Sequence, residues 1–297
     1  MKLYNDYGSY LKERYGTKVY RIGLDAGFSC PHRCLYCNED GSRSSYADPK
    51  KSITEQLSGR IEYLKKSGDA SKFVAYFQAF TNTNSPVNRL KEIYDQILPF
   101  EEIIGLSIGT RPDCVDADKL KLISSYKDRY EVWLEYGLQS IHDRTLKTID
   151  RGHNFSDFLR AYDDTKKLSI PVCVHVIIGL PGETKEEIVG TARKLTELKV
   201  DGVKIHLLHI LKGSEFEKLY KNGDIRVLAQ EEYVELVCDF LENLSDGIII
   251  HRLTGQGKRP DHIAPLWALD KPGTIQKIKE TLMKRESCQG IKCACRP

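Results

Sequence analysis

The first two thirds of the chain alternate between short apolar runs and longer amphipathic segments. The apolar runs are nearly continuous in hydrophobic character, which is typical of β-strands buried on both faces. They cover residues 20–26, 73–79, 103–109, 132–138, 172–178 and 203–209. Between them, apolar residues recur at i, i+3 and i+4, which predicts helices. Ser85–Pro86 and Thr184, with Glu187 three residues on, are typical helix starts.

Six consecutive strand-then-helix units predict a parallel sheet with right-handed crossovers. We therefore expect an α/β fold, a partial (β/α)6 TIM-like barrel over residues 14–213, with its chemistry at the carboxyl ends of the strands. An open doubly wound sheet is the alternative, because periodicity does not fix curvature. After residue 213 the alternation stops. A helix near 228–244, a strand "GIIIHRL" and a basic helix near 273–285 predict a C-terminal α+β extension over residues 214–297.

Charge changes this picture only at the end of the chain. The 297 residues include 45 Lys and Arg and 42 Asp and Glu, and the net charge of +3 implies no affinity of the whole chain for polyanions. Residues 271–297 differ, because they carry seven basic residues and two Glu. Such a segment is either a solvated terminus or a surface that helps to hold nucleic acid or another anion.

The apolar runs and the cysteines indicate the cellular compartment in which the protein is expected. The amino-terminal segment is polar and lacks the apolar core of a signal peptide, and no apolar run approaches the roughly 20 residues of a membrane span. We therefore expect a cytoplasmic protein without a membrane partner. Nine cysteines in a reducing compartment predict metal ligation rather than a disulfide framework. The isolated Cys114, Cys173 and Cys238 lie in or beside apolar stretches and are expected to be small core residues.

Three cysteines follow the first predicted strand, in the stretch "CPHRCLYCNEDG". Cys30, Cys34 and Cys37 would lie on a loop at the carboxyl edge of the sheet. Thiolates are the ligands that iron–sulfur clusters require, and three of them can hold three irons of a cubane cluster. The fourth iron then stays open for a substrate or cofactor, as at catalytic metal sites. The alternatives are a zinc site completed by His32 or a distant residue, and cysteines that bind no metal.

The C-x3-C-x2-C spacing with an aromatic residue at Tyr36, at the end of the first strand of a β/α barrel, resembles the radical S-adenosylmethionine (SAM) superfamily. The resemblance covers roughly residues 14–213 and implies a barrel of the radical SAM type. It implies a 4Fe-4S cluster whose open iron binds the methionine part of SAM. An electron from the cluster then cleaves SAM to methionine and a 5′-deoxyadenosyl radical. A reductant protein of the flavodoxin or ferredoxin type is the implied partner.

Further stretches are similar to one branch of that superfamily, the YhcC/YtqA-type group, which is related to the radical SAM part of the Elongator catalytic subunit. They are "YFQAFTNTN" (76–84), "GLSIGTRPD" (105–113), "LEYGLQSIHDRTLKTIDRGH" (134–153), "HVIIGLPGET" (175–184) and "IHLLHILKGS" (205–214). This sequence departs from that group at one point, because the group usually has a longer insertion between its first two cysteines, whereas Cys30 and Cys34 are only four residues apart. Together with the basic tail, the resemblance implies an RNA nucleobase, such as a tRNA base, or another anionic metabolite as the substrate.

If the barrel forms, the residues that end its strands converge on SAM. Gln78 and Thr81 follow the second strand, where the superfamily usually has a Gly-Gly-Glu-like turn, and would accept from the methionine ammonium. Glu135 and Gln139 have the same parity as Gly137, which favours all three facing inward, towards ribose hydroxyls. The full set of expected cofactor contacts is Tyr36, Gln78, Thr81, Thr110, Glu135, Gln139, Ile178 and Gly179.

The later strand ends supply further candidates. Ile178 is expected against adenine, and Gly179 lets the backbone approach a ligand closely. His206 and His209 have opposite parity, so at most one of them faces the interior. Arg111 would pair with a carboxylate or phosphate in bidentate fashion, or form an ion pair with the nearby Asp113. The candidates for the substrate side are Arg111, Arg151, His153 and Lys212.

The chain ends in a second cysteine group, Cys288, Cys293 and Cys295. These residues could hold an auxiliary iron–sulfur cluster or a zinc ion, could form redox-active thiols, or could be incidental cysteines of a floppy tail. No residue is assigned as a catalytic acid, base or radical relay, since the radical itself abstracts hydrogen.

The leading hypothesis is therefore a radical SAM enzyme whose substrate is an RNA nucleobase, such as a tRNA base, or another anionic metabolite. One alternative is an electron-transfer or cluster-carrier protein that uses the same three cysteines without cleaving SAM. The other is a zinc-stabilised RNA-binding module without catalysis. The six-unit barrel argues against that module, because binding alone needs no deep cavity at the strand ends.

Overall fold

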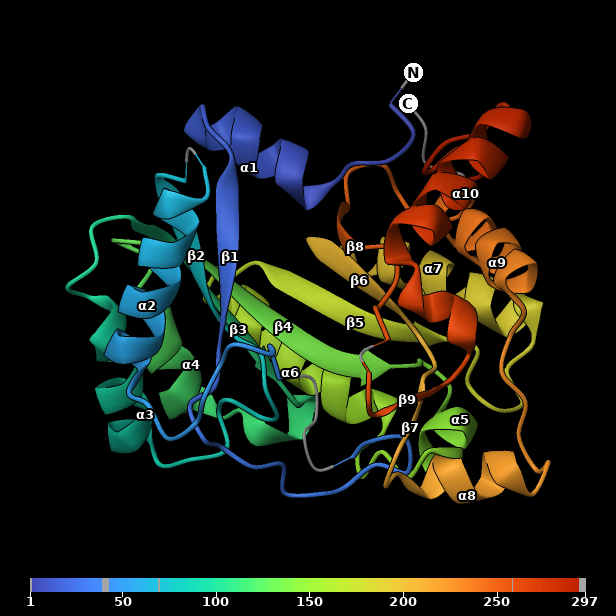
Figure 1. Cartoon of the computed structure of the whole chain (residues 1–297), viewed down its shortest axis with the longest axis horizontal. Helices are drawn as coiled ribbons and strands as arrows, with labels where there is room; N and C mark the ends of the chain where they lie inside the picture. Colours follow the sequence, from blue (N-terminus) through green and yellow to red (C-terminus); the bar gives the residue numbers. More distant parts are fainter. Residues whose placement is uncertain (1, 39–42, 69, 258, 294–297) are drawn as a thin grey trace.

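The computed structural model of the protein describes residues 2–38, 43–68, 70–257 and 259–293. Within these residues, parallel strands form one sheet that curls into a half-barrel (Figure 1). Their order across the sheet is β1-β2-β3-β4-β5-β6-β8. The bounds are β1 Val19–Leu24, β2 Lys72–Phe77, β3 Ile103–Thr110, β4 Glu131–Gln139, β5 Val172–Ile178, β6 Gly202–Leu207 and β8 Ile249–Arg252. The short strands β7 Ile210–Leu211 and β9 His262–Ala264 form a separate antiparallel pair.

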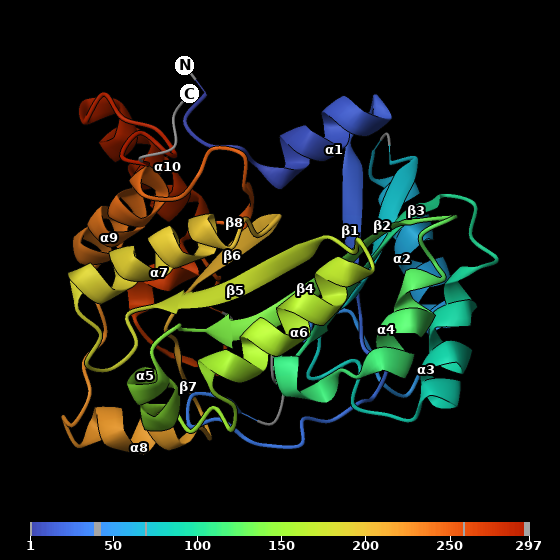
Figure 2. The same ribbon diagram turned by 180° about the vertical axis from the view of Figure 1, so that it is seen from behind.

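Helices lie between the strands, and Figure 2 shows α6 and α7 running across the outer face of the sheet. The bounds are α1 Tyr7–Tyr15, α2 Ile53–Lys66, α3 Val87–Tyr94, α4 Ala117–Ser124, α5 Asp143–Thr148, α6 Phe155–Lys167, α7 Lys185–Glu197, α8 Glu215–Lys221, α9 Gln230–Glu242 and α10 Lys271–Lys284. Thr184 caps α7, and Glu187 bonds back to the Thr184 backbone, so the predicted helix start is confirmed. The helix α3 begins directly after Pro86, as the sequence predicts.

The predicted α/β barrel is confirmed, and β1 to β6 agree with the six predicted strands to within two residues at each end. The strand predicted at "GIIIHRL" is β8. It lies parallel to β6, with Gly202 opposite Ile249 and Lys204 opposite Arg252. The residues after 213 therefore add a strand to the barrel sheet, while α9 packs on α7 and α10 packs on α9.

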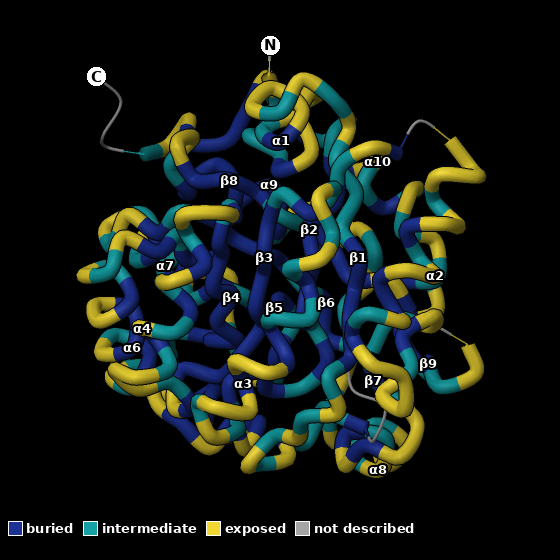
Figure 3. The backbone as a smooth tube through the Cα atoms, turned by 90° about the vertical axis from the view of Figure 1, so that its left-hand side faces the viewer, coloured by how far each residue is buried: buried dark blue, intermediate teal, exposed yellow. Residues whose placement is uncertain are grey.

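The core fills the space between the sheet and its outer helices, and Figure 3 shows β3, β4 and β5 buried along much of their length. Cys114, Cys173 and Cys238 are buried, which confirms their prediction as core residues. The helix α1 lies across the amino end of the barrel, where the Tyr7 ring stacks on His251 with 4.0 Å between ring centroids. None of the helices in the described residues combines the length and hydrophobicity that a membrane span needs.

Candidate functional site

The cysteine loop, residues 29–38, leaves β1 at the carboxyl edge of the sheet, where the sequence predicts it. Backbone hydrogen bonds tie this loop to segments far away in the sequence. Leu35 N donates to Ile149 O at 3.1 Å, and Phe216 N donates to Leu35 O at 3.1 Å. The side-chain amide of Asn84 donates to the loop carbonyl of residue 29 at 3.0 Å. The loop is therefore held by the ends of several β/α units.

Hydrogen-bond donors approach the sulfur atoms from neighbouring strand ends. Thr81 Oγ1 donates to Cys30 Sγ at 3.1 Å, and Arg151 Nη1 donates to Cys34 Sγ at 3.3 Å. A hydrogen bond with Cys37 lowers the pKa of Cys34 to about 5, an effect that burial opposes and Arg151 reinforces. The same bond, together with burial, raises the pKa of Cys37 well above its usual range. Of Cys34 and Cys37, Cys34 therefore loses its proton first, and its thiolate lies beside the Arg151 guanidinium.

This donor set fits three corners of a 4Fe-4S cluster, because the three thiols stand on one loop with cationic and hydroxyl donors beside them. Arg151 is buried and fixed, since its Nε and Nη2 donate to Gly137 O at 3.2 and 2.6 Å. His32 is engaged elsewhere, with Nε2 2.7 Å from the Asp150 carbonyl oxygen. This contact uses one ring nitrogen of His32 only, so the zinc alternative stays untested.

The residues that end β2 and β3 lie beside this loop. Gln78 Nε2 donates to Ser44 Oγ, on the segment that follows the cysteine loop. Thr110 is buried at the end of β3, and its hydroxyl lies 2.5 Å from that of Thr83. Thr81 contacts a cysteine, as described above. These positions agree with the expected edge of a cofactor site, and their contacts with SAM stay predictions.

The ends of β4 and β5 divide between two surfaces. Gln139 has φ +77° and ends β4, and Gly179 follows β5 with φ +94°, the left-handed region that favours glycine. Ile178 packs in the core between the sheet and the outer helices. Its neighbour Ile177 belongs to the apolar group around Tyr36 at the carboxyl edge. Successive strand residues face opposite ways, so Ile177, rather than Ile178, is on the side of the cysteine loop.

Glu135 lies two residues deeper along β4 than Gly137 and is fully buried. Its carboxylate pairs with Arg21, with His175 Nε2 at 2.8 Å and with Lys204 Nζ at 2.6 Å. Burial alone would raise the pKa of Glu135, but Arg21 and Lys204 hold it well below its usual range. The carboxylate therefore stays ionised inside the barrel, where cations already satisfy it.

The expected substrate-side residues do not form one group. Arg111 is buried and makes two hydrogen bonds to Asp113, at 2.9 and 2.8 Å, so it forms the predicted ion pair. Arg151 contacts Cys34. His153 Nε2 lies 3.3 Å from Gly137 O, and burial, with help from the charge of Arg151, lowers the pKa of His153 to about 4. Lys212 is exposed beyond β7.

Comparison with known proteins identifies the family to which the chain belongs. A family model of the radical SAM superfamily matches residues 26–195, and a model of the radical SAM C-terminal domain matches residues 200–284. The chain belongs to the radical SAM superfamily. It is therefore a radical SAM enzyme, and the cofactors of that family are a 4Fe-4S cluster and SAM. The three cysteines of the loop are the residues that fit the cluster.

Relatives of this radical SAM enzyme match over nearly the whole chain. Uncharacterized protein MJ0486 of Methanocaldococcus jannaschii is 41% identical over 98% of this chain and 92% of its own length. Protein YhcC of Escherichia coli is 40% identical over 90% and 88%, and uncharacterized protein YtqA of Bacillus subtilis is 37% identical over 97% and 92%. The predicted resemblance to the YhcC/YtqA-type group is confirmed.

Two further similarities are weaker. A tRNA uridine(34) acetyltransferase of M. jannaschii is 28% identical over 65% of this chain and 34% of its own length. Among solved structures, an archaeal Methanocaldococcus infernus Elp3 has a TM-score of 0.69 at 19% identity. That match covers 93% of this chain and 64% of the Elp3 chain, and it shows a shared fold.

The C-terminal cysteines that the structure describes in this radical SAM enzyme, Cys288 and Cys293, follow α10 and lie away from the cysteine loop. Cys288 is buried and Cys293 is half-buried, while Cys295 lies outside the described residues. The adjoining Gln289 holds the segment beside the amino terminus, because its backbone N donates to Leu3 O at 2.9 Å. Figure 1 shows α10 running up to the level of α1, at the amino edge of the barrel, whereas β1 points to the opposite edge. An auxiliary metal site there stays a prediction.

The basic residues of the C-terminal segment are partly neutralised. The helix α10 packs on α9, whose acidic residues face it. Arg285 pairs with Asp239 and Glu242, at 3.0 Å in each case, and Lys277 pairs with Glu231 at 3.1 Å. These contacts favour a structural role for the basic side chains involved. They weaken the interpretation of this segment as a surface for nucleic acid.

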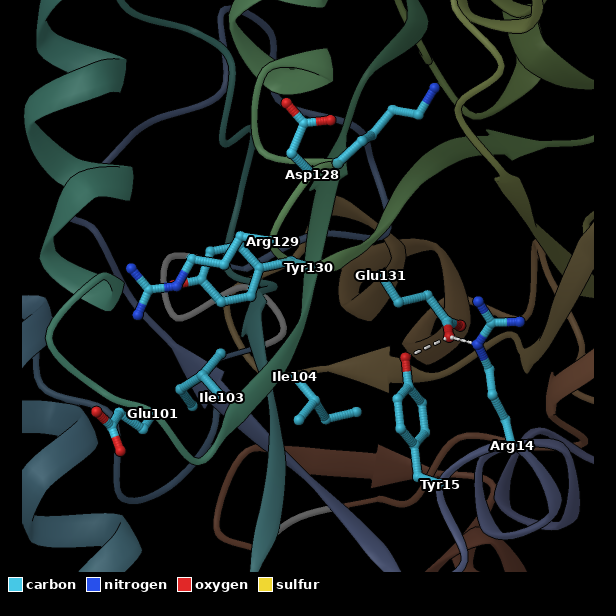
Figure 4. A pocket seen from close by; sticks show the side chains of 10 residues that line it. Arg14, Tyr15, Glu101, Ile103, Ile104, Asp128, Arg129, Tyr130 and Glu131 are labelled. Atoms are coloured by element: carbon cyan, nitrogen blue, oxygen red, sulfur yellow. Dashed lines mark hydrogen bonds and ion pairs between the residues drawn. The ribbon is translucent and has the colours of Figure 1, made fainter.

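A surface pocket of about 490 Å³ lies at the other end of the sheet (Figure 4). It is formed where β3 and β4 begin, and Glu131 accepts from Tyr15 at 2.8 Å and from Arg14 at 2.8 Å. None of the sequence-predicted site residues lines it. In β/α barrels this amino-terminal face serves stability, so we assign the pocket no role in the reaction.

Sequence reasoning missed the polar partners of Glu135 inside the barrel. They are Arg21 on β1, His175 on β5 and Lys204 on β6. The sequence contained a signal for these residues, because each of the three interrupts an apolar run that predicts a strand buried on both faces. Charged residues at inward positions of such strands indicate a polar barrel interior.

Proposed function

We propose that this radical SAM enzyme reductively cleaves SAM at the cysteine loop and directs the radical into the barrel interior, onto a tRNA base. The observation that carries the first part is the loop itself, with three thiols at the carboxyl edge and a buried arginine on Cys34. When bound, the cluster and SAM supply a 5′-deoxyadenosyl radical, which abstracts hydrogen from the substrate.

The chain's own residues prepare this edge of the barrel. Arg151 and Thr81 donate to two of the sulfurs, which favours the thiolates that the metal needs. Gly137 presents its carbonyl to Arg151, and because it has no side chain, the Arg151 and Gln139 side chains pack closely against it at this strand. Tyr36 packs with apolar residues that follow β5 and β6, and so helps to exclude water from the edge.

A tRNA base is the finer part of the proposal, and two observations support it. One is the similarity to a protein named as a tRNA uridine(34) acetyltransferase. The other is the position of basic groups at the mouth of the barrel: Lys212 is exposed there, and Arg33 Nη2 donates to the adjacent Gly213 O at 3.0 Å. Such groups can hold phosphates without reading a sequence.

Anaerobic reconstitution tests the cleavage. The wild-type protein, loaded with iron and sulfide and given SAM, should form 5′-deoxyadenosine when dithionite replaces the expected flavodoxin- or ferredoxin-type reductant. Cys34→Ala should lose both the cluster absorbance and the product, whereas Cys238→Ala, a change at a buried cysteine on α9, should keep both. An iron-loaded protein that never consumes SAM would support the cluster-carrier alternative instead.

Nucleoside analysis tests the substrate. Modified nucleosides of tRNA from a strain without this protein are compared with those of its parent. We expect one modified nucleoside to disappear and its precursor to accumulate. An unchanged nucleoside profile together with normal SAM cleavage in vitro would reject tRNA and leave the enzyme class intact.

A further inference from the structure

A layer of buried polar side chains crosses the barrel interior beneath the cysteine loop. Lys204 Nζ is 2.6 Å from both Glu135 Oε2 and Tyr76 Oη, and Lys204 is 2% exposed. The Arg21 guanidinium lies over the Tyr76 ring, 4.0 Å from its centroid, and pairs with Glu135. We call this layer the interior cluster, and its members are Arg21, Tyr76, Glu135, His175, Lys204, His206, His251 and Arg252.

The charges of the interior cluster do not balance. Arg21, Lys204 and Arg252 face a single carboxylate, that of Glu135. Arg252 is half-buried, and within the described part of the chain it has no hydrogen bond and no ion pair. Burial lowers the pKa of Lys204 to about 7, against the pull of Glu135 and with help from the two arginines. Like charges confined in a buried layer cost stability unless an anion joins them.

Hydrogen-bonding capacity is also unfilled in this layer. Arg21 Nε, His206 Nε2 and both ring nitrogens of His251 are buried without a partner among the described residues. Burial lowers the pKa of His206 and of His251 well below its usual range, so both rings are neutral and each offers a donor. A network that served structure alone would satisfy its buried polar atoms. The unpaired donors of the arginine and the two histidines are therefore available to a ligand that accepts hydrogen bonds.

The layer lies close to where the radical forms. Glu135 and Gly137 are both inward on β4, two residues apart, which is about 7 Å along a strand. Gly137 O accepts from Arg151, which in turn donates to Cys34 Sγ. The interior cluster is thus one layer below the cysteine loop, on the inner face that the radical would enter.

A metal ion is the competing occupant. The side-chain donor atoms of Glu135, Cys173 and His175 lie within 4.8 Å of one another. However, Lys204 and Arg21 already bind the carboxylate, and their charges repel a cation. Burial raises the pKa of Cys173 well above its usual range, so its thiol is protonated and a poor ligand. The interior cluster therefore favours an anion over a metal.

We propose that Arg21, Lys204 and Arg252 bind a compact anionic group, a carboxylate or a phosphate, of the molecule on which the radical acts. Arginine suits this task because its fork of donors matches both groups, and a buried lysine adds a point charge. The inference deepens the proposed function and rests on it, since it takes the barrel interior as the place of reaction. A free small molecule or a tRNA nucleotide could carry the group.

The test is anion binding by the reconstituted full-length enzyme, without SAM or reductant. The thermal midpoint is followed against inorganic phosphate and, separately, acetate, with sodium chloride at equal ionic strength as the reference. The wild type should show a saturable rise with at least one of them. Arg252→Gln should weaken that binding about tenfold or more, and Arg252→Lys should restore part of it. Among the described residues Arg252 makes no hydrogen bond or ion pair that these substitutions would remove, so the variants should fold.

Arg226→Gln is the matched control, because it removes the same charge from an exposed ion pair with Glu232 at 3.0 Å. Equal weakening in this control, or no rise in the wild type, would overturn the proposal. If bulk tRNA abolishes the phosphate effect, the anionic group belongs to tRNA, and if it does not, a free small molecule carries it. Formation of 5′-deoxyadenosine is measured separately, so a failure of SAM cleavage is distinguishable from a failure of anion binding.

Discussion

At the scale of single residues, Arg151 links the metal edge of the barrel to its interior. Its guanidinium donates to Cys34 Sγ through one nitrogen and to Gly137 O through two others. The sequence places Arg151 in a loop signature but does not say which way the side chain points, so we expected it on the substrate side. Its burial beside a sulfur shows that it contacts the cluster loop instead.

Arg151→Gln should weaken cluster binding, because it removes the positive charge that favours the Cys34 thiolate. Loss of about one unit of pKa stabilisation corresponds to roughly tenfold weaker ligation by that sulfur. The measurement is iron retained against a chelator after anaerobic reconstitution. Arg151→Lys keeps the charge and should retain part of the affinity. Equal iron retention in the wild type and in both variants would contradict this role.

At the scale of elements, β4 shows what strand parity can and cannot tell. Parity places Glu135 and Gly137 on one face, and the ion pairs of Glu135 with His175 and Lys204 agree with this. The register of β4 shifts between Gly137 and Gln139, but the Gln139 side chain still lies beside Gly137. Parity does not show how deep each residue lies, so Glu135 was assigned to a cofactor although cations surround it. Depth depends on the curl of the sheet and on its neighbours, which one strand's sequence does not contain.

Gly137→Ala tests this close packing on β4. A Cβ there would lie 2.9 Å from Arg151 Nη2 and 2.8 Å from Gln139 Nε2, so the guanidinium must shift away from Cys34. We expect lower iron retention at nearly unchanged helix content in circular dichroism.

Gly190→Ala is the control for that substitution. Gly190 lies within α7 with nothing within 4 Å of the added carbon, and alanine there should stabilise the protein by about 1 kcal/mol. If both variants bind iron equally well, the close contact at Gly137 has no bearing on the cysteine loop.

At the scale of the whole molecule, buried histidines make stability depend on acidity. Burial lowers the pKa of His175 and of His209 to about 4, and it also lowers the pKa of His206 and of His251 well below its usual range. In the unfolded chain these groups bind protons below about pH 6.5, whereas in the folded protein they stay neutral to about pH 4. The unfolded state therefore binds more protons in this window, and folding stability falls as the pH falls.

We expect the free energy of unfolding of the cluster-free protein to drop steeply between pH 6.5 and pH 4, by on the order of 3 kcal/mol for a histidine such as His175. Urea denaturation across this range gives the measurement. His209→Gln should flatten the dependence, because glutamine does not titrate. A free energy that is constant from pH 7 to pH 4.5 would contradict the prediction.

The fold itself was largely predictable, because β1 to β6 alternate with helices in a regular pattern. Local periodicity could not place β8 in the sheet, since its partner β6 ends at Leu207 and two helices intervene before Ile249. The interior cluster could not be predicted from local periodicity for the same reason. Its members come from β1, β2, β4, β5, β6 and β8, and only the curl of the open sheet brings Arg21 on β1 near Arg252 on β8.

The position of β8 at the border of the barrel sheet has a further consequence, which concerns association between chains. An outer strand of an open sheet offers unpaired backbone groups to which another molecule can add a strand. Here Ile250 N donates to Asn5 O at 2.7 Å, and Asp6 pairs with Ile250 as an isolated parallel bridge. The first residues of the chain therefore shield the outer border of β8. Removing residues 1–6 should leave the barrel folded but promote concentration-dependent aggregation, which light scattering would detect.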